Sequence, residues 1–232
     1  MSLCSPCGRS SEVHIAASIL AADFACLGPA AREAELGGAD SIHIDMMDGH
    51  YVPNLTFGFD LLPALRKWTT LPLVAHLELD NPDALIEPLA QAGPDMIVVQ
   101  EDTCPRLDET IAHIRSYGVS AGVGVNPDRR LEPVLPYLPQ VDLLIIMSVP
   151  PGFGGQPFDE SVLPKVSLAR RHRDEHDLRL RIGLDGGVNE GTIVRAVQAG
   201  ADYFIMGSAI FQRDGVGTAI ARLRERICQS MA

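Results

Sequence analysis

The chain has 232 residues, of which 46% are hydrophobic and 21% are charged, a balance typical of globular proteins. A formal net charge of -11 argues against a nucleic-acid partner, since such binding needs clustered Lys and Arg. It leaves open a small phosphorylated ligand held by backbone N–H groups. No apolar run approaches the ~18 residues of a membrane span, so we expect no membrane partner.

The polar start of the chain, residues 1–12, is predicted to be a flexible extension that precedes one catalytic domain over residues 13–232. It lacks the apolar region of a signal peptide, and the five cysteines form no disulfide-like framework. Cys4 and Cys7 have the spacing of half a zinc site, but no second pair follows. Together these features predict a protein of the reducing cytoplasm.

Eight apolar segments rich in β-branched residues recur along the chain. They are predicted to be strands, at Val13–Leu20, Ser41–Met47, Leu71–Leu79, Asp95–Gln100, Val119–Val125, Val141–Val149, Leu178–Asp185 and Asp202–Gly207. Segments with helical spacing that end in Gly lie between them, among them Cys26–Gly38, Asn81–Gly93, Leu107–Gly118 and Asn189–Gly200.

This alternation predicts βαβ units with parallel strands. Right-handed crossovers then leave two solutions, an open doubly wound sheet or a closed barrel. The count of eight favours closure, and no G-x-G-x-x-G motif of a dinucleotide-binding sheet follows the first strand. The predicted fold is a single (β/α)8 (TIM) barrel.

Polar side chains stand at the C-terminal ends of several predicted strands, where such barrels carry their chemistry. His43 and Asp45 share one face of a strand because they are two residues apart, and His76 and Asp185 end two other strands. Alone, each residue is ordinary: a core histidine, or an Asp that caps the next helix. Together they form a mixed nitrogen and oxygen set that suits zinc, iron or manganese better than calcium or magnesium.

Glycines gather in the last three loops at the same end of the predicted barrel. They occur in "VPPGFGGQPF" (Val149–Phe158), "DGGVN" (Asp185–Asn189) and "GSAIF" (Gly207–Phe211). Barrels often bind phosphate with the loops after strands 7 and 8, whereas a single such loop would be only a tight turn. We therefore expect a phosphate site, and Val149–Phe158 is also a candidate lid, with Phe153 closing over the ligand.

Five segments, "SILAADFACLG", "HIDMMDGHYVPNLTFG", "MSVPPGFGGQPF", "DGGVN" and "GSAIF", resemble the signature segments of the ribulose-phosphate 3-epimerase family, in order from about Ile15 to Phe211. The resemblance implies a metal-dependent isomerase that interconverts D-ribulose 5-phosphate and D-xylulose 5-phosphate through an enediolate. Carried over, it makes His43, Asp45, His76 and Asp185 the metal ligands and Asp45 and Asp185 the acid/base pair. The implied substrate-binding residues are Ser18, His76, Gly152, Phe153, Gly154, Gly155, Gly186, Gly187, Gly207 and Ser208.

The resemblance also implies one divalent transition metal per chain, and a homo-oligomer, either a dimer or a hexamer. The metal we predict is zinc, with iron, manganese and cobalt as alternatives. A Schiff-base aldolase is disfavoured, because the only lysines, Lys67 and Lys165, fall in predicted helical segments away from strand ends.

The chain departs from the family pattern at a few positions. Glu78 stands where the family usually has Met, and Gln100-Glu101-Asp102 where it usually has His-x-Glu. Glu78 is therefore a candidate specificity residue, together with Met47 and Met147. Two alternatives follow: a sister epimerase for another phosphorylated ketose, such as a hexulose 6-phosphate, or a barrel that only binds sugar phosphate.

Overall fold

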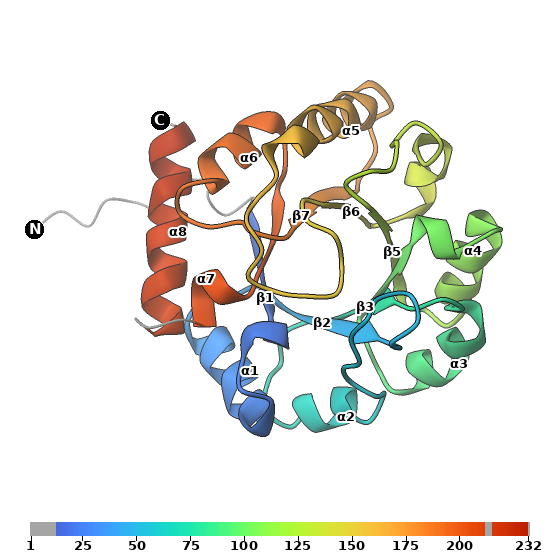
Figure 1. Cartoon of the computed structure of the whole chain (residues 1–232), viewed down its shortest axis with the longest axis horizontal. Helices are drawn as coiled ribbons and strands as arrows, with labels where there is room; N and C mark the ends of the chain where they lie inside the picture. The colour runs from blue at the N-terminus through green and yellow to red at the C-terminus, as the bar shows by residue number, and fades with distance from the viewer. Residues whose placement is uncertain (1–12, 212–214, 232) are drawn as a thin grey trace, which may run out of the picture.

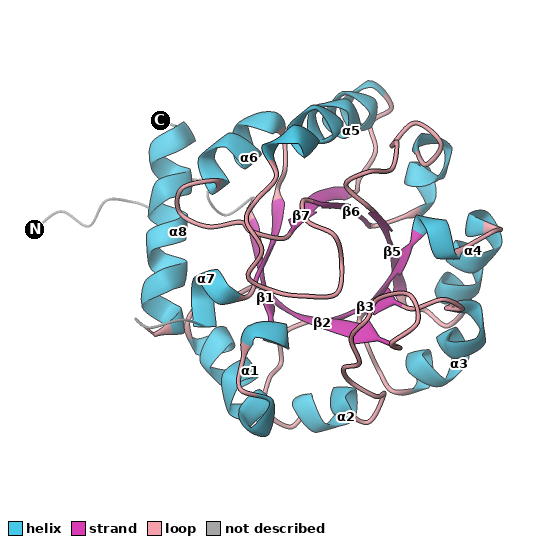
Figure 2. Cartoon of the chain, in the orientation of Figure 1, coloured by secondary structure: helices cyan, strands magenta, loops and turns pink. Residues whose placement is uncertain are grey.

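The computed structural model describes residues 13–211 and 215–231, so the predicted N-terminal extension with Cys4 and Cys7 lies outside the described residues. Eight parallel strands close into a barrel in chain order, with the last strand pairing with the first (Figure 1 and Figure 2). The strands are β1 (His14–Ser18), β2 (Ser41–Met47), β3 (Leu73–Glu78), β4 (Met96–Gln100), β5 (Ser120–Val125), β6 (Leu143–Met147), β7 (Arg181–Asp185) and β8 (Tyr203–Met206). The predicted (β/α)8 barrel is confirmed, and each strand falls inside its predicted segment.

Helices surround the barrel (Figure 2). They are α1 (Leu27–Leu36), α2 (Leu61–Leu65), α3 (Asp83–Gln91), α4 (Leu107–Ser116), α5 (Leu163–Glu175), α6 (Ile193–Ala199), α7 (Ser208–Phe211) and α8 (Val216–Met231). Within the described ranges, no helix is both long enough and apolar enough to cross a membrane.

The connection from β5 to β6 differs from the others, because it contains only a 3-10 helix, Leu135–Gln140. Pro139 lies inside it and lacks the N–H that a helix interior needs, which disfavours an α-helix there. Four other short 3-10 helices lie at Ile19–Ala21, Phe24–Cys26, Glu101–Thr103 and Glu160–Val162.

The strands are buried on both faces, which explains their nearly continuous apolar sequences. On β2, Ile42 and Ile44 belong to the large core that includes the surrounding helices. The barrel interior is filled by a second cluster of Ala16, Val74, Val98, Leu143, Ile145, Met147, Tyr203 and Ile205. Since side chains alternate along a strand, His43 and Asp45 on β2 point the other way from Ile42 and Ile44, into the barrel.

Candidate active site

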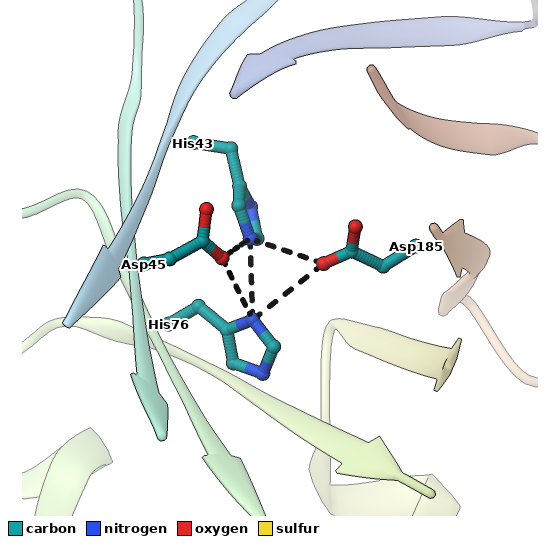
Figure 3. Close-up of side chains that lie close together, drawn as sticks. All are labelled: His43, Asp45, His76 and Asp185. Carbon is teal, nitrogen blue, oxygen red and sulfur yellow. Dashed lines mark hydrogen bonds and ion pairs between the residues drawn. The ribbon is translucent and has the colours of Figure 1, made fainter. Parts of the chain in front are cut away.

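Four side chains from β2, β3 and β7 meet inside the mouth of the barrel (Figure 3). His43 Nε2 lies 3.1 Å from Asp45 Oδ1 and 3.6 Å from Asp185 Oδ2. His76 Nδ1 lies 3.4 Å and 3.7 Å from the same two oxygens, and 3.2 Å from His43 Nε2. The structure thus brings together all four residues that the sequence suggested as metal ligands.

This geometry fits a single divalent transition metal. One donor atom from each of the four residues lies within 4.8 Å of the others. Four ligands at about 2.1 Å from a tetrahedral zinc ion would be roughly 3.4 Å apart. The two histidine nitrogens lie 3.1–3.7 Å from each other and from the two carboxylate oxygens, which is close to this value. Two buried imidazoles and two carboxylates are also the donor chemistry that zinc, iron or manganese prefers.

The pKa values of the two carboxylates in the cluster are shifted in opposite directions. Burial acts to raise the pKa of Asp45, but the charge and hydrogen bonds of His43 and His76 outweigh it and hold this pKa below its usual range. Ser18 Oγ also donates a hydrogen bond to Asp45 Oδ2 at 2.9 Å. Burial and then the charge of Asp45 raise the pKa of Asp185 to about 7.

A cavity at the mouth of the barrel lies over this cluster. Asp45 and Asp185 line it, but His43 and His76 do not, since both are completely buried. His76, which the resemblance implied as a substrate contact as well as a ligand, therefore lies beneath the cavity. The other residues suggested by the sequence all line the cavity: Ser18, Met47, Glu78, Met147, Gly152, Phe153, Gly154, Gly155, Gly186, Gly187, Gly207 and Ser208.

The glycine-rich end of the cavity is formed by loops that approach each other closely. Gly187 has a φ of 63°, and a Cβ there would lie 2.3 Å from the backbone N of Phe158. Only glycine therefore allows the loops after β6 and β7 to meet at this point. No Lys or Arg of the described ranges lines the cavity, so a phosphate here would depend on backbone N–H groups and the Ser208 hydroxyl.

The loop between β6 and α5 passes in front of the barrel centre, where it is coloured gold in Figure 1. Asn54 Nδ2 donates to the carbonyl of Gly152 at 2.8 Å, and Gln156 Nε2 donates to the carbonyls of Pro150 and Phe153 at 2.8 and 2.9 Å. Phe153 is nevertheless 54% exposed, and a Cβ added at Gly154 would meet no atom within 4 Å. The loop is thus anchored at Gly152 but open at its tip.

Glu78 ends β3 on the wall of the cavity and is only 2% exposed. It accepts a hydrogen bond from the backbone N–H of Gly152, whereas its Oε2 is buried without a partner in the described part of the chain. Burial, and then the negative charges of Asp45 and Asp185, raise the pKa of Glu78 well above its usual value. Glu78 is not a member of the four-residue cluster.

The structure corrects the placement of the two lysines. Lys67 lies just beyond α2 rather than within a helix. Lys165 lies on α5, but its ammonium donates to the carbonyls of Asn126 and Pro127 after β5, at 2.8 and 3.1 Å. It therefore does approach a strand end, yet it does not line the cavity, so no amine is placed for a Schiff base.

Several contributors to the site escaped prediction from the sequence. Thr56 Oγ1 donates to the carbonyl of Asp45 at 2.5 Å and accepts from the N–H of Met47 at 3.0 Å, which fixes the end of β2. Thr56 lies within the second of the five signature-like segments, which was the only signal for it. Asn54 and Gln156, which anchor the β6 loop, likewise lie inside these segments but carried no signal of their own.

Fold and site together define a (β/α)8-barrel enzyme with two histidines and two carboxylates at its catalytic face. The ribulose-phosphate 3 epimerase family model matches residues 14–211. The chain belongs to this family and is therefore a carbohydrate epimerase of the isomerase class.

Individual relatives agree with this assignment over nearly the whole chain. Ribulose-phosphate 3-epimerase of Bacillus subtilis (strain 168) is 44% identical and is matched over 91% of this chain and 98% of its own length. The Mycobacterium tuberculosis (strain ATCC 25618 / H37Rv) protein of the same name is 43% identical, over 94% and 95%. Among solved structures, KGPDC from Streptococcus mutans aligns with a TM-score of 0.67 at 15% identity, covering 95% of this chain and 99% of that one, and supports the fold alone.

Proposed function

We propose that the protein interconverts D-ribulose 5-phosphate and D-xylulose 5-phosphate by removing and returning the proton on the carbon next to the ketone. The observation that carries this proposal is the pair of carboxylates, Asp45 and Asp185, which line one cavity and reach the same cluster from different strands. Family membership supports the substrate pair.

Inversion of a carbon needs a proton acceptor on one face of a planar enediolate and a proton donor on the other. Asp45 and Asp185 approach the two histidine nitrogens from opposite sides in Figure 3. We therefore assign one carboxylate to each face, each acting as base in one direction and as acid in the other. The Ser18 hydroxyl donates a hydrogen bond to Asp45 Oδ2 and so orients this carboxylate on β2.

His43, Asp45, His76 and Asp185 would hold the divalent metal, and zinc is the ion we propose. When bound, such an ion would stabilise the negative charge that develops on the substrate oxygens. The barrel keeps the histidines out of contact with solvent, since both are completely buried. The phosphate of the substrate would lie at the other end of the cavity, near the backbone of Gly186, Gly187, Gly207 and Ser208.

Exchange of the α-proton with deuterated water tests this function. The purified protein is offered a panel of ketose phosphates, and deuterium incorporation and inversion are followed together by NMR. We expect exchange coupled to inversion for ribulose 5-phosphate and xylulose 5-phosphate. Binding of these sugars without any exchange would instead support the barrel that only binds sugar phosphate.

Glu78 is the residue that favours the second candidate, an epimerase for another phosphorylated ketose. A Met side chain would give the cavity an apolar, adaptable wall, whereas Glu78 places a carboxyl group in that wall, with no hydrogen-bond partner for Oε2 among the described residues. Loss of a substrate hydrogen bond costs roughly 1–3 kcal/mol, or about one to two powers of ten in discrimination. We expect Glu78→Met to shift relative kcat/KM towards ribulose 5-phosphate and away from a non-standard substrate.

The kcat/KM for ribulose 5-phosphate and for a non-standard ketose phosphate must be measured on the wild type, on Glu78→Met and on Glu78→Gln. The Gln variant keeps a hydrogen-bonding group of the same shape. If the ratio of the two kcat/KM values is the same in Glu78→Met as in the wild type, Glu78 does not select the substrate. The plain pentulose-phosphate function would then be strengthened.

The tip of the β6 loop is expected to close over the bound substrate. Gly152 is held by Asn54, while Phe153 is exposed and Gly154 has open space around it. A non-reacting substrate analogue should therefore slow amide hydrogen exchange at residues 153–155 and slow chymotryptic cleavage after Phe153. Equal exchange and equal cleavage with and without the analogue would indicate a rigid turn.

Two further expectations stay predictions: a cytoplasmic location and a homo-oligomer, either a dimer or a hexamer. Cys26, Cys104 and Cys228 are free thiols, which suits a reducing compartment. The number of subunits is open to measurement by light scattering.

A further inference from the structure

Gln100 is a buried polar residue that the reaction above does not use. It ends β4, has no exposed surface, and lies with its side-chain amide nitrogen 3.0 Å from His76 Nε2. Its Oε1 has no hydrogen-bond partner among the described residues. A buried amide oxygen without a partner is costly, so this arrangement calls for a physical reason.

The two nitrogens of His76 have separate neighbours. Nδ1 faces Asp45 and Asp185, so it is the atom that would bind the metal. A neutral imidazole that binds a metal through Nδ1 must carry its proton on Nε2. An Nε2–H needs an acceptor, but the amide NH2 of Gln100 is a donor, so the two groups would oppose each other as placed.

Rotation of the Gln100 amide by half a turn removes this opposition, because its oxygen and nitrogen have nearly the same shape. Oε1 then accepts the proton of His76 Nε2, and the amide NH2 takes the position that Oε1 has left. We propose that Gln100 is the positioning residue of the metal centre, fixing His76 in the tautomer that presents Nδ1 to the metal. This inference rests on the proposed metal-dependent function.

Gly124 on the neighbouring strand makes room for this contact. It is paired with Gln100 in the parallel register of β4 and β5. A Cβ at Gly124 would lie 2.7 Å from Gln100 Oε1 and 2.9 Å from Gln100 Cδ. The strand therefore carries a glycine at the point where any side chain would push the amide away from its place beside His76.

His43 provides a contrast within the same cluster. Its Nε2 faces the carboxylates, but its Nδ1 is buried without a hydrogen-bond partner in residues 13–211 and 215–231. Metal-binding histidines usually donate their second N–H to an acceptor, and the orientation of the ring depends on that bond. Of the two ligand histidines, His76 is therefore the one whose tautomer a neighbouring side chain selects.

The test compares zinc affinity, measured by competition with a chelating indicator, in the wild type, Gln100→Met and Gln100→Glu. Met has nearly the same size as Gln but offers no strong acceptor, whereas Glu keeps an acceptor at the same position. We expect Gln100→Met to bind zinc about 10- to 100-fold more weakly, the usual effect of removing such a partner. Gln100→Glu should bind at least as tightly as the wild type, because carboxylates are common partners of metal-binding histidines.

A second readout follows the tautomer directly. In protein labelled with 15N-histidine, the zinc-bound wild type should show a protected Nε2–H signal for His76, and Gln100→Met should lose that protection. If Gln100→Met does not fold, Gly124→Ala displaces the same amide without changing either partner and should also weaken zinc binding. Thr110→Val, which removes a buried hydroxyl on α4, is the control for the general loss of a buried polar contact and should leave zinc affinity unchanged.

The outcomes separate this inference from the proposed function. Wild-type protein that binds none of zinc, iron, manganese and cobalt would overturn the metal-dependent function itself. If the wild type binds zinc and both Gln100→Met and Gly124→Ala bind it equally tightly, the role of Gln100 is overturned while the metal-dependent function stands. Equal weakening in Gln100→Met and Gln100→Glu would also overturn it, because the acceptor would then not be what matters.

Discussion

Replacement of Asp45 or Asp185 by Asn is expected to abolish turnover, with a loss of about 10²–10⁴-fold from the proton transfer alone. Asn keeps the shape of Asp but can neither accept nor return a proton at these positions. Both carboxylates line the cavity, with side chains that are only 6% and 16% exposed, so water cannot readily take their place.

Hydrogen exchange can separate the proton-transfer role from metal binding, since both residues are also proposed ligands. If each carboxylate serves one face of the substrate, a variant that retains metal should still exchange the α-proton of one epimer with solvent, without inverting it. Asp45→Asn and Asp185→Asn should then exchange opposite epimers. Metal content is measured in the same samples, so that loss of the ion is not mistaken for loss of the base.

A matched control comes from Asp80, an exposed carboxylate that follows β3 on the same face of the barrel. Asp80→Asn should retain turnover near that of the wild type. Near-normal turnover in Asp45→Asn or Asp185→Asn would exclude that carboxylate as an obligatory acid or base. Exchange of the same epimer by both variants would contradict the assignment of one carboxylate to each face.

The barrel and the four-residue cluster were predictable because both follow from periodicity. A buried strand has an apolar sequence, and residues two apart share a face, so His43 and Asp45 had to point into the same space once β2 was placed. The C-terminal ends of parallel strands meet at one end of the barrel, which placed His76 and Asp185 beside them.

Contacts between strands could not be predicted in the same way. The partnership of Gln100 with His76 depends on the register of β4 against β3 and on the space beside Gly124. The reach of Lys165 from α5 to the end of β5 depends on the direction of a long side chain, which sequence spacing does not give. Such contacts can be identified only from the three-dimensional structure, because strand register and side-chain direction are set by packing across the whole barrel.

Removal of the divalent metal is expected to lower turnover by at least about two powers of ten, because stabilisation of developing charge by a metal is worth several kcal/mol. Without the ion, the cluster must balance its charges internally. Burial acts to lower the pKa of His43, but Asp45 and Asp185 outweigh it and raise this pKa. Burial lowers the pKa of His76, which therefore stays neutral and ready to bind.

Treatment with a chelator, followed by addition of zinc, iron, manganese or cobalt to separate portions, measures this dependence and identifies the metal that restores the most activity. Zinc should also raise the Tm of the metal-free protein, since a ligand that binds the folded state stabilises it by mass action. That readout is independent of catalysis, and it reports on the four ligands even when the wrong sugar is offered.

The variant His76→Asn tests whether the metal binds at the four-residue cluster. It should lower zinc occupancy and turnover together, because a neutral imidazole supplies one of the strong bonds to such an ion. His176→Asn changes an exposed histidine just beyond α5 and should alter neither. Full turnover in protein verified to be free of metal would refute the metal dependence. Normal zinc binding by His76→Asn would instead move the metal away from the cluster of His43, Asp45, His76 and Asp185.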